Sequence, residues 1–215
     1  MDKEKIDKKD HILDVAERVF ADKGFDGAST RLISGEAGVN MAMLNYYFGS
    51  KEGLFLAIFE RKIAHFQSVL QNLGNNENMG PWEKMETYIE LYGDKIVSNN
   101  CFQKLLYKEM VMDRGNELSD KLREMLLKNV GEVERILKEG ISSGVFRKDI
   151  DIPMVIAVIY GTKNYIINTP LMSSSLLGYD IRDDGMIETK LKPQIKSFMK
   201  NLLKCYLFKH NENTI

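Results

Sequence analysis

Residues 29–51 read STRLISGEAGVNMAMLNYYFGSK, a stretch that predicts two short helices joined by a tight turn. Ser29 or Thr30 can cap the first helix and Asn40 the second, because their side-chain oxygens accept hydrogen bonds from unpaired N–H groups at a helix start. Gly38 allows the positive φ that a turn directly after a helix requires. A helix, a turn with glycine and a second short helix form the helix-turn-helix pattern.

The second helix of this pattern, about residues 40–48, has a core side and a free side. Leu44 and Phe48 are four positions apart and therefore share one face. In a helix-turn-helix, the first residues of the second helix reach base edges in the major groove of DNA. Ser50 can cap the long helix that follows, where Lys51 can meet a phosphate beside unpaired N–H groups. We therefore predict DNA contacts from ten side chains: Ser29, Thr30, Arg31, Asn40, Met41, Ala42, Asn45, Tyr46, Tyr47 and Lys51.

The side chains on the free side suit this role. Met41 and Ala42 are small enough to let the backbone approach the groove, and Asn45 can form a hydrogen bond with a base or a phosphate. Tyr46 and Tyr47 carry hydroxyls on rigid rings that can reach phosphate oxygens. The alternative is that both tyrosines only pack against the first helix and that the lysine at position 51 is simply solvated.

The charge around this stretch is only mildly positive. The chain has 30 Lys+Arg and 31 Asp+Glu, so it lacks the overall basic excess typical of nucleic-acid-binding proteins. Between Gly27 and Lys51, however, Glu36 is the only acidic residue. We therefore expect few phosphate contacts per subunit and a modest dependence of DNA affinity on salt. The lysines among residues 3–9 are interpreted as a solvated tail, with contact to the DNA backbone as the alternative.

The rest of the chain predicts an all-α fold. There are only four prolines, and apolar residues recur three or four positions apart without strand-like alternation. Gly24 is placed to end the first helix in a left-handed conformation. Residues 170–186 carry turn signals and are expected to be looser. The expected helices number about nine and span about 5–23, 29–37, 40–48, 50–73, 81–98, 100–113, 117–142, 152–168 and 187–208. Residues 1–50 are predicted to form the helix-turn-helix domain, and residues 51–215 a helical bundle for effector binding and dimerisation.

Several function classes are not favoured. No N-terminal apolar segment resembles a signal peptide, and no apolar run approaches the roughly 18 residues that span a bilayer, which predicts a cytoplasmic protein without membrane contact. Cys101 and Cys205 are far apart and expected to be reduced and buried. His11, His65 and His210 are isolated, and no catalytic, phosphate-binding or metal-ligand motif is present. No metal, cofactor or enzymatic activity is therefore expected.

Five short motifs fall within roughly residues 8–60: ILDVAERVF (12–20), KGF (23–25), STRLI (29–33), AGVN (37–40) and LNYYFGSKEGL (44–54). With these motifs the N-terminal quarter resembles the TetR/AcrR family of regulators. Ser34 and Gly35 stand where alanine and a helix former are more usual, and Asn45 stands where many members carry tyrosine. Tyr46 or Tyr47 can take over the tyrosine–phosphate contact that the resemblance implies.

Dimerisation is expected from the last two long helices. The helix near 152–168 is apolar almost all round, which indicates burial on most faces, and the last helix is also rich in apolar residues. Two such helices from each subunit can pair as a four-helix interface, as the resemblance also implies; the alternative is packing only within one subunit. A dimer would hold two reading helices about one DNA turn apart, roughly 34–36 Å, over a pseudo-palindrome. The predicted dimer residues are Val155, Ile159, Ile195, Phe198, Leu202 and Tyr206.

A small-molecule site is expected in the helices near 81–142. Aromatic and methionine side chains suit an apolar ligand cavity, although a filled core would contain the same residue types. The predicted effector residues are Tyr88, Tyr92, Phe102, Leu106, Tyr107, Met110 and Met125. The resemblance implies that a small hydrophobic effector moves the helix beginning at Ser50 and so releases the DNA.

The sequence as a whole thus predicts a ligand-responsive, dimeric transcription regulator, more often a repressor than an activator in such a fold, that binds a double-stranded DNA operator. Two alternatives stay open. One is a DNA-binding regulator or architectural protein without an effector, which a solid bundle would favour. The other is a helical enzyme whose N-terminal unit is only structural, which a cleft lined by titratable groups would favour.

Overall fold

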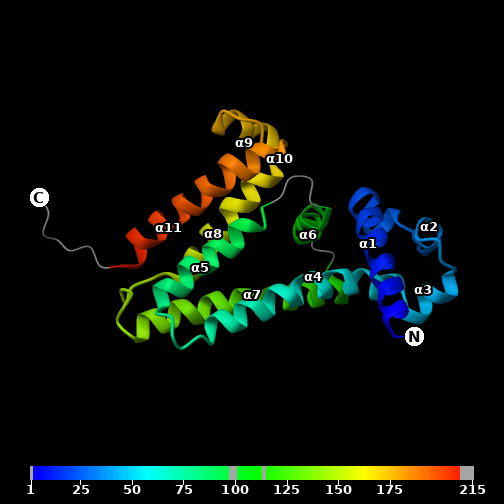
Figure 1. Ribbon diagram of the computed structural model, residues 1–215, viewed down its shortest axis with the longest axis horizontal. Helices are drawn as coiled ribbons and strands as arrows, with labels where there is room; N and C mark the ends of the chain where they lie inside the picture. Colours follow the sequence, from blue (N-terminus) through cyan, green and yellow to red (C-terminus); the bar gives the residue numbers. More distant parts are fainter. Residues whose placement is uncertain (1, 97–100, 113–114, 209–215) are drawn as a thin grey trace, which may run out of the picture. The chain divides into compact units, whose positions relative to one another are not determined.

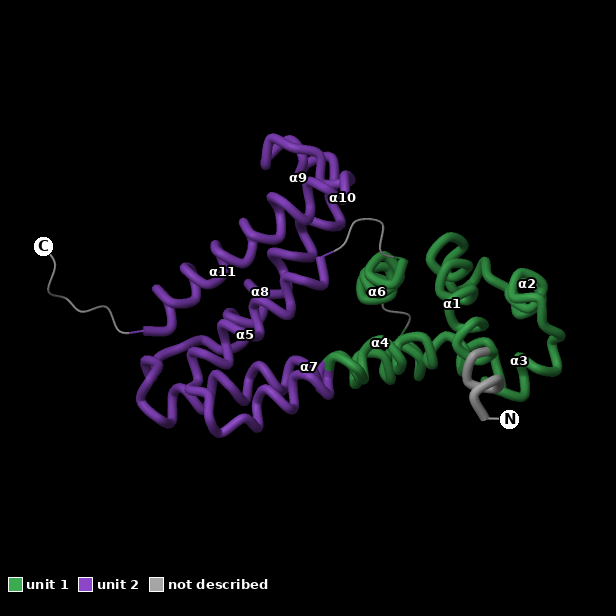
Figure 2. The backbone as a smooth tube through the Cα atoms, in the orientation of Figure 1, with its two compact units in different colours: residues 1–66, 100–126 green, residues 67–99, 127–215 purple. Residues whose placement is uncertain are grey.

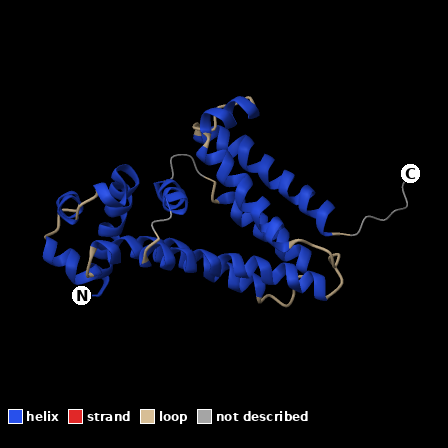
Figure 3. Cartoon of the chain, turned by 180° about the vertical axis from the view of Figure 1, so that it is seen from behind, coloured by secondary structure: helices blue, strands red, loops and turns tan. Residues whose placement is uncertain are grey.

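The computed structural model describes residues 2–96, 101–112 and 115–208, with side chains from residue 8 onward. Within these ranges every regular element is a helix (Figure 1 and Figure 3), which confirms the all-α class. The helices are α1 (Asp2–Gly27), α2 (Thr30–Glu36), α3 (Met41–Phe48), α4 (Lys51–Gly74), α5 (Pro81–Asp94), α6 (Cys101–Met112), α7 (Glu117–Ser142), α8 (Ile152–Asn168), α9 (Pro170–Leu177), α10 (Asp184–Met186), the π-helical turn η1 (Ile187–Leu191) and α11 (Lys192–Leu207).

Two departures from the predicted helices have local causes. The stretch expected to be loose contains α9, which starts at Pro170, where the missing N–H of proline costs nothing. Gly178 ends α9 in the left-handed conformation, with φ 77°. The Asp183 side chain then accepts a hydrogen bond from the Met186 N–H at 3.0 Å, so the last helical run begins at α10 rather than at 187. When α10, η1 and α11 are counted as one continuous run, the described ranges hold ten helices, in agreement with the prediction of about nine.

Gly24 interrupts α1 as expected, although not in the expected conformation. Its φ of 73° is positive, but its ψ of 172° lies outside the left-handed helical region. The helical conformation resumes after Gly24 and continues to Gly27. The thiol prediction was half right: Cys101 and Cys205 are free, but Cys205 is exposed and Cys101 only half-buried.

The chain divides into two compact units (Figure 2), unit 1 of residues 1–66 with 100–126 and unit 2 of residues 67–99 with 127–215. Helices α4 and α7 each continue from one unit into the other. Unit 1 thus adds α6 and the start of α7 to the predicted helix-turn-helix domain. The functional division at residue 50 stays a prediction, since packing alone does not say which residues bind DNA.

The core of unit 1 is built around phenylalanine side chains. Phe20 on α1 and Phe55 on α4 are fully buried and meet edge to face, with ring centroids 4.9 Å apart. Phe59 continues this contact to Phe102 on α6 at 5.4 Å. Aromatic pairs of this geometry stabilise a core beyond the area they bury. They hold α1, α4 and α6 together as the support for α2 and α3.

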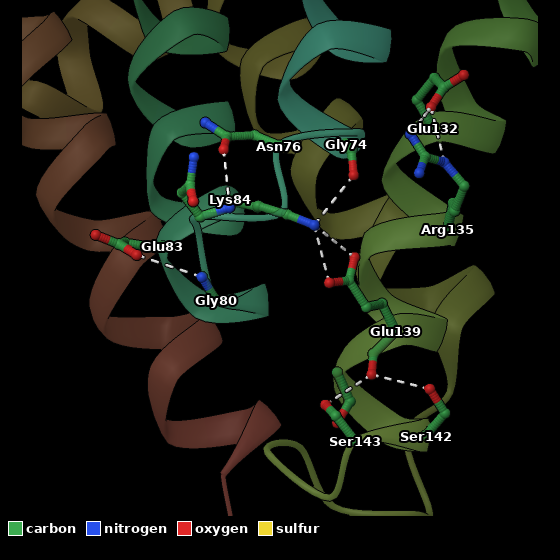
Figure 4. A network of polar contacts seen from close by, with 12 residues as sticks. Gly74, Asn76, Gly80, Glu83, Lys84, Glu132, Arg135, Glu139, Ser142 and Ser143 are labelled. Atoms are coloured by element: carbon green, nitrogen blue, oxygen red, sulfur yellow. Dashed lines mark hydrogen bonds and ion pairs between the residues drawn. The ribbon is translucent and has the colours of Figure 1, made fainter.

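Unit 2 contains a buried charged network (Figure 4). Lys84 on α5 is buried, and its Nζ donates hydrogen bonds to Glu139 Oε1 at 2.8 Å, to Oε2 at 2.9 Å and to the carbonyl of Gly74 at 3.0 Å. Gly74 is the last residue of α4, whose final carbonyls lack partners within the helix. One ammonium therefore ties the end of α4 to α5 and α7.

Within the described ranges, no helix combines the length and the apolar character that crossing a bilayer requires.

Candidate nucleic-acid interface

The turn between α2 and α3 has the hydrogen bonds that the sequence predicts. Ser29 Oγ accepts the N–H of Leu32 at 3.1 Å, and Asn40 Oδ1 accepts the N–H of Met43 at 2.7 Å. Gly38 has φ 64°. Each cap satisfies an N–H that would otherwise be unpaired at a helix start. The predicted helix-turn-helix geometry is confirmed.

Helix α3 is anchored through one side only. Leu44 is fully buried, and Tyr47 and Phe48 are half-buried against the core of unit 1. At the far end, Gly49 ends the helix with φ 73°, and its N–H donates to the Asn45 carbonyl at 2.8 Å. Apolar contacts along one face and caps at both ends hold an eight-residue helix that would be unstable alone.

The opposite side of α3 is open. Tyr46 keeps 73 % of its surface exposed, and Met41, Ala42 and Asn45 are exposed as well. We call these four residues the reading face. Tyr47, whose ring centroid lies 5.3 Å from that of Tyr46, is the tyrosine that packs inward.

The remaining predicted contacts are divided between surface and interior. Ser29, Arg31 and Asn40 are exposed, while Thr30 is half-buried. Lys51 is also half-buried: its Nζ lies 4.5 Å from the centre of the Phe25 ring and 3.5 Å from the carbonyl of Asp26. The phosphate contact expected of Lys51 stays a prediction; in the structure its ammonium lies over an aromatic ring of α1.

The junction of α3 with α4 is unusually close. A Cβ added at Gly53 would lie 2.1 Å from the carbonyl oxygen of Phe48, so no residue but glycine fits without movement. The N–H of Gly53 donates to Ser50 Oγ at 3.0 Å, which confirms the predicted cap of α4. The position of α3 is therefore fixed against the first turn of α4.

Two residues of α1 make contacts near α2 and α3 that the sequence analysis did not predict. Lys9 on α1, interpreted as solvated tail, places its Nζ 5.9 Å from the centre of the Phe48 ring, so a cation lies beside the end of α3. His11 Nε2 donates to the Ala37 carbonyl at 3.2 Å and ties α1 to the end of α2. The sequence signal for these contacts was a lysine and a histidine two positions apart in the first helix.

An acidic residue also adjoins the interface. Glu52 directly follows residues 27–51, in which Glu36 is the only acidic residue, and it is exposed in the first turn of α4. Hydrogen bonds from its own backbone N–H and from Ser50 lower the pKa of Glu52. It is therefore ionised at neutral pH and offsets part of the positive charge of the α2–α3 segment.

The predicted effector residues do not form one group. Tyr88 and Tyr92 on α5 stack in unit 2, with centroids 5.7 Å apart. In unit 1, Phe102 is part of the core, and Leu106 and Met125 pack against it. Two further members of the set, Tyr107 and Met110, are exposed on α6. The set is thus divided into an aromatic pair on α5, a group of three in the core of unit 1 and two exposed residues on α6.

Half of the predicted dimer residues are buried within the chain. Val155, Ile159 and Ile195 are at most 7 % exposed, so they pack inside the subunit. Phe198 and Leu202 are exposed on α11. Tyr206 is half-buried, with the Arg147 guanidinium 4.3 Å from its ring centre. Sequence reasoning missed the exposed side of α8, formed by Met154, Ala157, Gly161 and Tyr165.

Comparison with known proteins places this geometry in a family. The family model described as "Bacterial regulatory proteins, tetR family" matches residues 12–58, and "Tetracyclin repressor-like, C-terminal domain" matches residues 81–193. The HTH-type transcriptional repressor NicS of Pseudomonas putida is 30% identical over 176 residues, which are 81% of this chain and 82% of that protein. The fatty acid metabolism regulator protein of Bacillus subtilis is 25% identical over 80% of this chain and 87% of its own length.

A solved structure shows the same fold. The fatty acid degradation regulator FadR from Bacillus halodurans superposes with a TM-score of 0.67 at 21% sequence identity, over 89% of this chain and 97% of that chain. The family match begins within α1 and includes the whole reading face. Together, the capped α2–α3 pair, the two matched segments and the similarity to the NicS repressor show that this chain belongs to the tetR family of bacterial regulatory proteins.

Proposed function

We propose that the protein is a homodimeric repressor that inserts the reading face of α3 into the major groove of a pseudo-palindromic operator and is released by a small-molecule effector. The observation that carries this proposal is the asymmetry of α3. Leu44 and Phe48 pack the helix against its unit. The four residues of the reading face are exposed and take no part in this packing.

The chemistry of the reading face suits sequence readout. The Asn45 amide can form two hydrogen bonds with the N6 and N7 positions of adenine, and Ala42 can contact a thymine methyl group. The Tyr46 hydroxyl can reach a phosphate, which fixes the register of the protein on the duplex without reading sequence. Lys9 and Arg31, both exposed, are the cations that can add backbone contacts.

Dimerisation is proposed through the exposed sides of α8 and α11. On α8, Ala157 and Gly161 lie between Met154 and Tyr165 at helical spacing, so a second helix can approach closely there. On α11, Phe198 is 54 % exposed, and Leu202 follows one turn later. A symmetric dimer places the same surface of both subunits against itself. This is the arrangement that would bring two reading faces to adjacent major grooves.

The test begins with selection of binding sites from random duplexes by the full-length protein. The selected sites should be inverted repeats, since two symmetric subunits read them. Asn45→Ala and Tyr46→Ala should each weaken binding of the selected duplex by about tenfold or more, as expected for a lost contact of 1–3 kcal/mol. Asn75→Ala, which changes an exposed asparagine outside α3, serves as the matched control. Unchanged binding by both α3 variants would refute the assignment.

A further inference from the structure

We propose that the effector carries a carboxylate, which is received by Lys163 together with the hydroxyls of Tyr88 and Tyr160 inside unit 2. This inference rests on the proposed function, because it names the chemical class of the effector. It concerns a cluster of four side chains, the three tyrosines 88, 92 and 160 and Lys163, which we call the tyrosine–lysine cluster.

Lys163 is a buried cation without a countercharge in the part of the chain that the structure describes. It lies on α8 and is only 5 % exposed. The contact that the structure gives its Nζ is the face of the Tyr92 ring, 4.4 Å from the ring centre. Within the described ranges no carboxylate lies at ion-pair distance from it, whereas the other buried lysine, Lys84, is paired with Glu139. A buried ammonium that lacks an anion is costly in free energy.

The electrostatics of the site favour an anion. Burial lowers the pKa of Lys163 to about 8, and the nearby positive charge of Lys95 lowers it further in the same direction. No acidic group contributes to that shift. An entering anion would offset both effects, because it would supply the missing countercharge and would raise the pKa of the Lys163 ammonium.

Two hydrogen-bond donors in the same cluster are also unused. The hydroxyl oxygens of Tyr88 and Tyr160 are buried, and among the described residues neither has a partner in hydrogen-bond geometry. The two hydroxyls nevertheless lie close enough for each to shift the pKa of the other. The Tyr92 ring contacts both of their rings, with centroids 5.7 Å from Tyr88 and 5.2 Å from Tyr160. Burial raises the pKa of Tyr88 well above its usual value, so its hydroxyl keeps its proton and can donate. Native proteins pair most buried polar groups, and here two unpaired hydroxyls share one site with an unpaired ammonium.

The donor set indicates the ligand class. One ammonium and two hydroxyls offer one positive charge and several N–H and O–H donors, which suit the two oxygens of a monoanionic carboxylate. The three aromatic rings of the cluster suit an apolar or aromatic body attached to that group. A neutral hydrophobe would fill space but leave the ammonium and both hydroxyls unpaired.

The experiment compares carboxylates with their uncharged amides. The full-length wild-type protein is titrated with octanoate, benzoate and phenylacetate and with octanamide, benzamide and phenylacetamide, by thermal shift and by calorimetry. A ligand that binds only the native state raises the melting temperature. We expect carboxylates of this panel to raise it and their amides to have little effect.

Variants then locate the binding. Lys163→Met should weaken carboxylate binding by about tenfold or more, since a hydrogen-bonded charge is lost, whereas Lys163→Arg should retain part of it. Tyr88→Phe and Tyr160→Phe, which remove only the hydroxyls, should each weaken it severalfold. Lys148→Met, at an exposed lysine of the same unit, should bind like the wild type. Equal binding of amides and carboxylates, unchanged affinity in Lys163→Met, or no carboxylate binding in the panel would overturn the proposal.

Operator binding is measured separately on the same proteins. Lys163→Met should still bind the selected duplex but should no longer release it when carboxylate is added. If the wild type bound no duplex, the proposed function would fail, while the titration, which needs no DNA, would still decide whether the tyrosine–lysine cluster receives a carboxylate.

Discussion

Lys84 Nζ lies 2.8 Å from Glu139 Oε1, and the lysine side chain is 4 % exposed whereas the glutamate side chain is 37 % exposed. The pair is therefore unequal, because the cation depends on its partner more than the anion does. Removing the glutamate charge strands a buried ammonium, while removing the lysine leaves a carboxylate that water can reach.

This asymmetry gives a stability prediction. Glu139→Gln should lower the free energy of unfolding by about 1–3 kcal/mol, below the full range for a buried pair because the carboxylate is partly solvated. Lys84→Met should cost less. Urea denaturation measures both. Glu134→Gln, which breaks an exposed pair with Lys138 on the same helix, should change stability by less than about 0.5 kcal/mol. A larger loss for Lys84→Met than for Glu139→Gln would contradict this account.

A second prediction concerns the α3–α4 junction. Gly53→Ala places a methyl group against the Phe48 carbonyl, which is backbone and cannot turn aside. The substitution should cost about 1–3 kcal/mol and should weaken operator binding further by shifting α3. Gly131→Ala on α7, where a Cβ would meet nothing within 4 Å, should instead be neutral or stabilising by up to about 1 kcal/mol. Thermal denaturation and a gel shift of both variants separate the two cases.

A third prediction separates the two tasks of Asn40. Its side chain caps α3 and is also exposed near the reading face. Asn40→Ala should cost about 0.5–2 kcal/mol because the cap is lost, and operator affinity should fall with it. Asn40→Ser keeps a capping oxygen, so its stability should match the wild type. If the serine variant binds operator as the wild type does, capping is the whole contribution of Asn40; if it binds less, the amide also contacts DNA.

A fourth prediction follows from the low pKa of Lys163, about 8 instead of 10.5. Since the folded protein holds this proton less tightly than the unfolded chain, stability from this group rises as pH increases from about 8 to 10.5 and is lowest at neutral pH. Lys163→Met should therefore be more stable than the wild type at neutral pH by about 2–4 kcal/mol. The difference should shrink as pH rises toward 10.5. Urea denaturation across this pH range checks the trend, and a destabilised variant at neutral pH would argue for a counterion at the site.

A fifth prediction concerns salt. Lys9 contacts the ring of Phe48 and is exposed beside the end of α3. If it meets a phosphate, Lys9→Gln should reduce the slope of log affinity against log salt by about one unit per subunit. Arg18→Gln, an exposed cation on the same helix, is the control and should leave the slope unchanged. If both variants have the same slope, Lys9 makes no phosphate contact and is simply solvated.

The parts of the structure that the sequence predicted are those decided locally. Ser29, Gly38 and Asn40 act through hydrogen bonds and backbone angles within a few residues, so their roles follow from residue type and order. The fully buried Leu44 likewise follows from spacing. In contrast, α8 is apolar on most sides, and only tertiary packing decides that Val155 faces inward and Met154 outward.

Lys163 had a signal that sequence reasoning left unused. It is the one charged residue in the run 152–168. A lone lysine in an apolar helix is either solvated at the surface or buried at a functional site. Choosing between these requires the positions of Tyr88 and Tyr92, which are on α5 and distant in sequence. For the same reason, the sequence could not predict which of Tyr46 and Tyr47 is exposed. Two adjacent residues of a short helix differ in burial only because of the residues that pack around them.

The anchoring of α3 by one side has an evolutionary consequence. Folding depends on Leu44, Phe48 and the caps, whereas the reading face contributes little to it. Substitutions at Met41, Ala42, Asn45 or Tyr46 can therefore accumulate in duplicated copies without unfolding them. Paralogues built on this scaffold can acquire new target sites one base pair at a time while keeping the same core.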